Sequence, residues 1–93
     1  MSVIKDSDFE SIREVGKAVK VYAEEIKKDI DKLLKRHENM HSVWSGKQYD
    51  QLTEILIETQ KILSKKSNNL IEISEEIKID ADNLEKANRQ QIK

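Results

Sequence analysis

The fold is decided by residues 49–84, YDQLTEILIETQKILSKKSNNLIEISEEIKIDADNL, in which an apolar side chain recurs at every seventh position. These positions hold Tyr49, Leu56, Leu63, Leu70, Ile77 and Leu84. A repeat of seven residues forms a stripe along an α-helix, and such a stripe is the side that packs against another helix. The second position of this heptad is mixed, with Leu52, Thr59, Lys66, Ile73, Asp80 and Ala87. The pattern predicts a helix over about residues 47–87, followed by a flexible C-terminal tail.

An earlier helix is predicted over about residues 8–40, again from a heptad repeat. One apolar row consists of Phe9, Gly16, Ala23, Ile30 and His37; the other consists of Ile12, Val19, Ile26, Leu33 and Met40, with Val15, Tyr22 and Leu34 widening the stripe. Two pairs, Ser7 with Glu10 and Ser45 with Gln48, have the spacing of a capping box, in which each side chain satisfies a free amide at a helix start. The two pairs therefore predict where the two helices begin.

The composition favours a fold made of these two helices alone. The chain has 93 residues, no Pro and two Gly. Without Pro nothing forces a helix to break, and with two Gly the sequence offers few positions for a tight turn. The short segment 41–46 is the only plausible turn, and a short connection makes two helices antiparallel neighbours. We therefore predict an all-α helical hairpin, a single domain over residues 1–93.

The seam of this hairpin is expected to pair apolar side chains of the two helices. Residues Ile12, Val19, Ile26 and Leu33 would face Leu56, Leu63, Leu70 and Ile77. The small residues Gly16 and Ala23 would face the region of Ile73, Leu70 and Lys66, because small residues opposite large ones suit close packing.

The hairpin leaves several apolar side chains of the second helix, among them Ile57, Ile71 and Ile79, off the seam. Burying a large aliphatic side chain stabilises a protein by roughly 1.5–3 kcal/mol. Association of two hairpins into a four-helix bundle would recover that free energy, so we expect a homodimer or a heterodimer with a helical partner. The alternative is that scattered exposed Ile residues are ordinary surface.

Charge and residue usage argue against several functional classes. Residues 1–44 carry nine basic and nine acidic side chains and residues 45–93 carry eight and nine, so no basic face favours nucleic acid. The chain has no Cys, and its N-terminus lacks the apolar region of a signal peptide. No segment is apolar enough to predict membrane insertion. We expect neither an enzyme nor a bound cofactor.

Residues 37–41, HENMH, match the H-E-x-x-H pattern of zinc proteases. Two imidazoles one helical turn apart can hold a metal ion, but a catalytic site also needs a third ligand, a cleft and oriented outer partners. His37 falls in the heptad row, and His41 lies near the helix C-terminus, where an imidazolium suits the helix dipole. We interpret the match as coincidental, leaving weak adventitious binding of zinc or nickel open.

The segment Trp44-Ser45-Gly46 lies at the predicted turn and holds the only Trp of the chain. One interpretation is that the indole plugs the end of the hairpin core while Gly46 lets the backbone turn. The other is recognition, because Trp is a favoured anchor residue at protein interfaces. The two interpretations are compatible.

In these features the chain resembles the WXG family of small type VII secretion proteins, which are relatives of the early secreted antigenic target. The resemblance covers the whole chain and rests on a length near 100, two helices, the central Trp44-x-Gly46, and an aromatic residue three positions later, Tyr49. It implies an antiparallel hairpin that dimerises into a four-helix bundle. It also implies export from a Gram-positive cell by a membrane ATPase-driven machine, without a cleaved signal peptide.

The chain departs from the family at its C-terminal export signal. Family substrates often carry Tyr-x-x-x-Asp/Glu after the second helix, and the best counterpart here is the segment 84–88, in which Leu84 replaces the Tyr and Asn88 the acid. In the family, the Trp-x-Gly turn of one subunit is thought to lie beside this signal of its partner. The resemblance therefore predicts a co-secreted partner or chaperone of a larger effector. The alternative is a cytoplasmic coiled-coil adaptor or antitoxin-like binding module without an export role.

Overall fold

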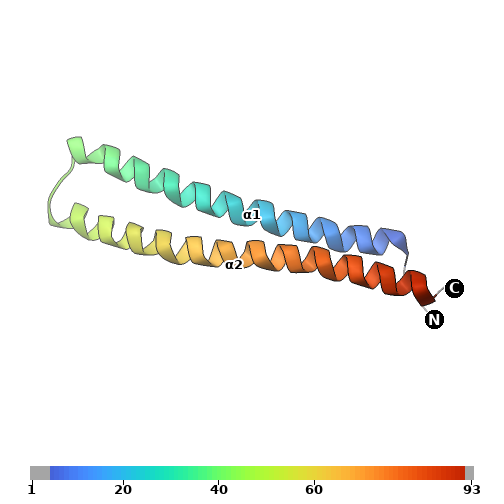
Figure 1. Cartoon of the computed structure of the whole chain (residues 1–93). Helices are drawn as coiled ribbons and strands as arrows, with labels where there is room; N and C mark the ends of the chain where they lie inside the picture. The colour runs from blue at the N-terminus through green and yellow to red at the C-terminus, as the bar shows by residue number, and fades with distance from the viewer. Residues whose placement is uncertain (1–4, 92–93) are drawn as a thin grey trace. The chain divides into compact units, whose positions relative to one another are not determined.

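The computed structural model describes residues 5–91, which form two long helices joined by a short turn (Figure 1). Helix α1 spans Asp6–Asn39, the 3-10 helix η1 spans Met40–Ser42, and α2 spans Lys47–Gln91. No strand occurs within residues 5–91. The predicted all-α helical hairpin is confirmed.

Helix α1 begins two residues before the predicted start. The backbone N–H of Lys5 donates to Asp8 Oδ2 at 2.9 Å, and the backbone N–H of Asp8 donates to the Lys5 carbonyl at 2.9 Å. Asp6 and Asp8 also place negative charge in the first turn, where the helix dipole favours it. The predicted capping box is therefore wrong, because Ser7 lies inside the helix and its carbonyl accepts from the Ser11 hydroxyl.

The turn is closed by backbone hydrogen bonds and by one glycine. The N–H groups of Val43 and Trp44 both donate to the Met40 carbonyl, at 3.0 and 2.8 Å. Gly46 has φ of 111°, a conformation that favours glycine, and its carbonyl accepts the first hydrogen bond of α2, from Asp50. Gly46, and not the predicted Ser45, is thus the residue that precedes the second helix.

Helix α2 continues past the predicted end at Ala87 as far as Gln91. The segment 88–91, predicted as a flexible tail, is helical, and residues 92–93 lie outside the described residues.

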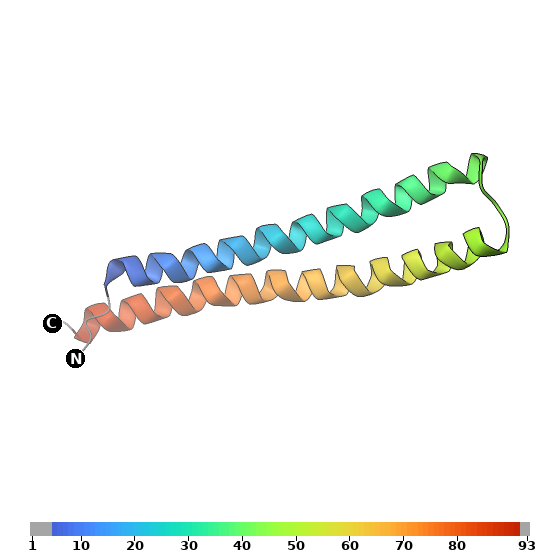
Figure 2. The ribbon, with the colours of Figure 1, turned by 180° about the vertical axis from the view of Figure 1, so that it is seen from behind.

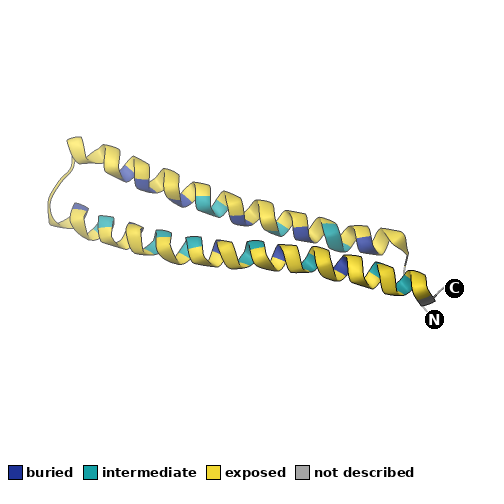
Figure 3. Cartoon of the chain, viewed as in Figure 1, coloured by how far each residue is buried: buried dark blue, intermediate teal, exposed yellow. Residues whose placement is uncertain are grey.

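The hairpin divides into two compact units. We call the first, composed of Met1–Tyr22 and Asn69–Lys93, the terminal unit, and the second, Ala23–Asn68, the turn unit. Each unit contains a segment of α1 beside a segment of α2, as the two opposite views agree (Figures 1 and 2). Figure 3 shows that the buried positions of each unit lie where these two segments face each other.

The first heptad row of α1 is buried, as predicted. Phe9 and Gly16 lie in the core of the terminal unit, and Ala23, Ile30 and His37 in the core of the turn unit. The second row is only partly covered, because Ile12, Val19 and Ile26 are half-buried while Leu33 and Met40 are exposed. Leu34 is buried in place of Leu33. Near the turn, therefore, the buried stripe of α1 moves to the neighbouring helical position.

The seam of α2 differs from the prediction more strongly. Its first row is buried at Tyr49 and Leu56, half-buried at Leu63, Leu70 and Ile77, and exposed at Leu84. The second row is formed by Ser67, Ser74 and Ala81, whereas the predicted row of Thr59, Lys66 and Ile73 lies half-buried or exposed.

Close approach of the two helices explains why small residues occupy this row. A Cβ atom added to Gly16 would lie 3.2 Å from the Ser74 carbonyl oxygen and 3.2 Å from Ile77 Cγ2. Gly16 therefore faces Ser74 and Ile77, which adjoin the predicted region of Ile73, Leu70 and Lys66. Where backbones lie this close, side-chain size decides which residues fit between the helices, and apolarity matters less.

Candidate recognition site at the turn

Tyr49 is the centre of the turn cluster, which we define as His37, Trp44, Tyr49 and Thr53. Its side chain is buried, and its hydroxyl donates to the His37 carbonyl at 2.9 Å. The carbonyls of the last helical turn have no partner within the helix. Tyr49 supplies such a partner from the start of α2, and so fixes the end of α1 to the beginning of α2.

His37 contributes a buried imidazole to the same cluster. Its ring stacks on Tyr49 with centroids 4.1 Å apart and 12° between the planes, and its Nε2 lies 2.6 Å from Thr53 Oγ1. The single hydrogen of the Thr53 hydroxyl is donated to the Tyr49 carbonyl at 2.9 Å. Nε2 of His37 is therefore the donor to Thr53 and carries a hydrogen.

Trp44 packs edge-on against the rings of both His37 and Tyr49. Its ring centroid lies 6.0 Å from that of His37 and 5.3 Å from that of Tyr49, at interplanar angles of 83° and 82°. The indole remains 37% exposed, and the next residue toward the N-terminus, Val43, is 77% exposed. One edge of Trp44 contacts the hairpin core while part of the ring faces solvent, so its position is compatible with both interpretations from the sequence.

The other turn residues, Ser45 and Gly46, matter for the backbone conformation of the turn. Ser45 and Gly46 are exposed, and a Cβ added to Gly46 would meet nothing within 4 Å, so the role of Gly46 is the positive φ and not a close contact. The sequence pointed to Trp44 and Tyr49, but it placed His37 in the packing row and in the H-E-x-x-H match, and did not single out Thr53. A sequence signal was available for Thr53, because it lies one helical turn after Tyr49.

The two histidines of the H-E-x-x-H match do not form a metal site with other residues. His37 Nε2 is used by Thr53, and the ring of His41 lies over Tyr49 with centroids 5.0 Å apart. Within residues 5–91 no group of three or more His, Asp or Glu side chains is arranged to hold a metal ion.

The counterpart of the C-terminal export signal lies in the terminal unit. Leu84 is 52% exposed, whereas Asn88 is half-buried. Between them, Glu85 is bound to α1, because Arg13 Nη2 lies 3.2 Å from Glu85 Oε1 and 2.8 Å from Asp82 Oδ1. The hydrogen bonds that Arg13 donates to the carboxylates of Glu85 and Asp82 raise the pKa of its guanidinium above the ordinary value.

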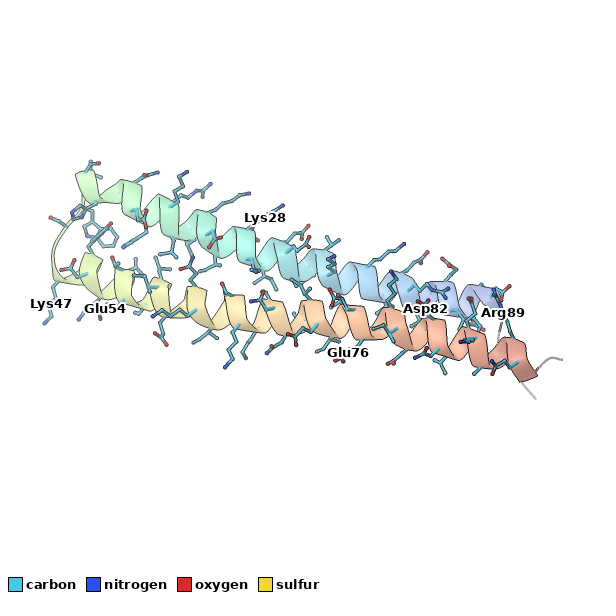
Figure 4. The ribbon with its side chains drawn as sticks, in the orientation of Figure 1. Lys28, Lys47, Glu54, Glu76, Asp82 and Arg89 are labelled. Atoms are coloured by element: carbon cyan, nitrogen blue, oxygen red, sulfur yellow. The ribbon has the colours of Figure 1, made fainter. Side chains whose placement is uncertain are left out.

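Figure 4 labels two members of these ion pairs, Asp82 and Arg89, both on α2. Arg89 Nη2 adds a second contact to Glu85 at 3.5 Å. The segment that would carry the export signal is therefore helical, with Leu84 pointing to solvent and Glu85 held by arginines.

Comparison with known proteins identifies no relative of this chain. No family model matches it, and no curated protein and no solved structure is significantly similar to it. Neither α1 nor α2, over the residues described, is both long and apolar enough to cross a membrane.

Proposed function

We propose that this protein is a WXG-like type VII secretion substrate or co-secreted partner of a larger effector, and that it acts by binding other proteins. The observation that carries the proposal is the partial exposure of Trp44, whose ring also packs against those of His37 and Tyr49. An anchor residue binds most effectively when its conformation is fixed before binding, because less conformational entropy is then lost. His37 and Tyr49 fix the indole in this way.

The terminal unit supports the role of a partner more than that of an independent substrate. Family substrates often carry a Tyr and an acid in this signal, and this chain has Leu84 and Asn88 at the corresponding positions. A receptor that recognises the Tyr hydroxyl and the carboxylate would lose the binding energy of both contacts with this chain. We therefore expect this chain alone to be exported poorly, and its export to recover when the effector that carries an intact signal is co-expressed.

The test is export, with the effector co-expressed, from a Gram-positive host that carries a type VII machine, with and without the secretion ATPase. Trp44→Ala is compared with Val43→Ala, which truncates the neighbouring and more exposed side chain that forms none of the ring contacts. We expect Trp44→Ala to abolish export while circular dichroism and effector binding persist, and Val43→Ala to export normally. Trp44→Phe, which keeps most of the apolar contact but loses the indole N–H, should export at an intermediate level.

Export of the Trp44→Ala variant at the wild-type level, at equal cellular abundance, would contradict the proposal. Appearance in the medium that does not depend on the ATPase would contradict it as well. Retention in the cell together with binding to a cytoplasmic helical protein would favour the adaptor function instead.

A further inference from the structure

The terminal unit contains a groove of about 760 Å³ between its segments of α1 and α2. Sites for small molecules have volumes of roughly 300–1,000 Å³, so this groove is large enough for one. We call it the lysine groove; it is lined by Arg13, Gly16, Lys17 and Lys20 from α1 and by Ser74, Glu75, Lys78, Ile79 and Asp82 from α2.

The floor of the lysine groove lies where the two backbones approach each other most closely. Gly16 and Ser74 are both buried there, and a Cβ atom added to Gly16 would lie 3.2 Å from the Ser74 carbonyl oxygen. Because position 16 has no side chain, the space above the floor stays open. The longer side chains on either side therefore form the walls of a concave site.

The charge of the lining favours an anionic ligand. Four cationic side chains and two carboxylates line the groove, which gives it a net charge of +2, whereas the whole chain has a net charge of −1. A concave surface with an excess of one sign of charge concentrates ligands of the opposite sign.

Arg13 is the one guanidinium of the lining, and its hydrogen bonds are already used within the hairpin. Its Nη2 lies 2.8 Å from Asp82 Oδ1 and 3.2 Å from Glu85 Oε1, and its Nε donates to Asp82 at 3.0 Å. The forked guanidinium is the group that best matches a planar carboxylate. A carboxylate ligand would therefore have to compete with Asp82 and Glu85 for it.

The other three cations of the lining are lysines, Lys17, Lys20 and Lys78. All three are exposed, and within residues 5–91 none of them forms an ion pair or a side-chain hydrogen bond. An ammonium group is a compact charge with three donors that binds phosphate oxygens from many directions. The cations that remain available thus suit phosphate better than carboxylate.

The spacing of the lysines indicates more than one phosphate group. Lys20 lies four residues after Gly16, and Lys78 lies four residues after Ser74. Because the two segments run in opposite directions, these lysines lie on opposite sides of the floor, roughly 12 Å apart along the groove at 1.5 Å per residue. Lys17 lies between them. A ligand with two or more linked phosphates can contact all three, whereas a single phosphate is too short.

Ile79 adds an apolar contact to the same groove. Its side chain is 57% exposed, and it lies next to Lys78 on the α2 wall. We propose that the lysine groove binds an organic polyphosphate, whose phosphates contact Lys17, Lys20 and Lys78 and whose organic part lies on Ile79. This inference goes beyond the proposed function, because it concerns the terminal unit and does not require export.

The test is a nuclear magnetic resonance titration of the purified full chain with inorganic triphosphate and, separately, with ATP. The buffer is free of magnesium and low in salt, because salt screens exposed charges. We expect saturable shifts at residues 13–20 and 74–82, with a dissociation constant on the order of 0.1–1 mM. ATP should bind about threefold more tightly than triphosphate, and Ile79→Ala should remove that difference only.

Charge variants give the sharper result, since all of the positions are exposed and the fold should keep its circular dichroism. We expect Lys17→Gln, Lys20→Gln and Lys78→Gln each to raise the dissociation constant for triphosphate about threefold or more. Glu75→Gln should lower it about twofold, because a repelling carboxylate is removed. The matched control is Lys86→Gln, an exposed lysine of the same unit outside the groove, which should have no effect.

Several outcomes would overturn the proposal. Absence of saturable binding at triphosphate concentrations up to about 10 mM is one, and an equal effect of Lys86→Gln and Lys78→Gln is another. Shifts spread over the lysines of the turn unit would show general attraction of anions and no site. Tighter binding of a Glu-rich peptide, or binding to anionic phospholipid vesicles without binding to triphosphate, would assign the groove to another class of ligand. Failure of the export test leaves all of these measurements unaffected.

Discussion

Ser67 provides the sharpest test of the packing between the helices. Its side chain is 1% exposed, and its hydroxyl has no hydrogen-bond partner. A buried hydroxyl without a partner costs about 1–3 kcal/mol, because its hydrogen bonds with water are lost on folding. Most core truncations destabilise a protein, but the substitution Ser67→Ala removes this unsatisfied group and is therefore expected to stabilise it.

The magnitude follows from three contributions. Removal of the unpaired hydroxyl stabilises the fold by about 1–3 kcal/mol, and alanine adds about 0.5 kcal/mol through its higher helix propensity. The small void left by one oxygen atom opposes these gains by up to about 1 kcal/mol. We expect the free energy of unfolding to rise by about 1–2 kcal/mol, and Tm by at least roughly 4 °C for a domain of this size.

The matched control is Ser74→Ala, seven residues further along the same row. Ser74 is also buried, but its hydroxyl donates to the Ile71 carbonyl at 2.6 Å. Loss of that bond offsets the gain in helix propensity, so Ser74→Ala should stay within about 1 kcal/mol of the wild type. Thermal and urea unfolding at one fixed protein concentration measure both variants, since association would shift Tm. Destabilisation by Ser67→Ala, or equal effects of the two substitutions, would refute the reasoning.

Three further substitutions test the core and the turn in the same unfolding assays. Leu56→Ala should cost about 2–5 kcal/mol as a buried truncation, whereas the exposed Glu58→Ala should be near neutral; equal effects would contradict the placement of the seam. Gly46→Ala should cost about 1–3 kcal/mol because of its φ of 111°, and a neutral result would show that the turn relaxes. Tyr49→Phe should cost about 1–2 kcal/mol through its lost hydrogen bond to His37, and no change would mean that water replaces the hydroxyl.

The sequence was sufficient for the architecture because heptad spacing depends only on helix geometry. Phe9, Gly16, Ala23 and Ile30 repeat every seven residues and are all buried. The same reasoning gave the wrong second row for α2, because it selected the more apolar residue, Ile73, over Ser74. Which of two adjacent rows faces the partner helix depends on how closely the backbones approach, and that distance is not encoded in hydropathy.

The turn cluster could be predicted only in part for a similar reason. Trp44 and Tyr49 were evident as aromatic residues beside Gly46. The roles of His37 and Thr53 depend on hydrogen bonds that form across the turn, at 2.6 Å and 2.9 Å. Such contacts follow from the rotation of one helix relative to the other, which the spacing of apolar residues does not fix to within one position.

The position of the turn cluster also has a consequence for the order of folding. The hydrogen bond between Tyr49 and His37 joins residues 12 apart in the chain, whereas that between Arg13 and Glu85 joins residues 72 apart. A sixfold longer loop costs about 1.6 kcal/mol more to close, since the entropic cost grows as (3/2)RT ln n. Folding should therefore nucleate at the turn and zip toward the termini, so that Trp44 fluorescence changes before the ion pairs of Arg13 form. A nascent chain could close its turn cluster before the last part of α2 has been synthesised.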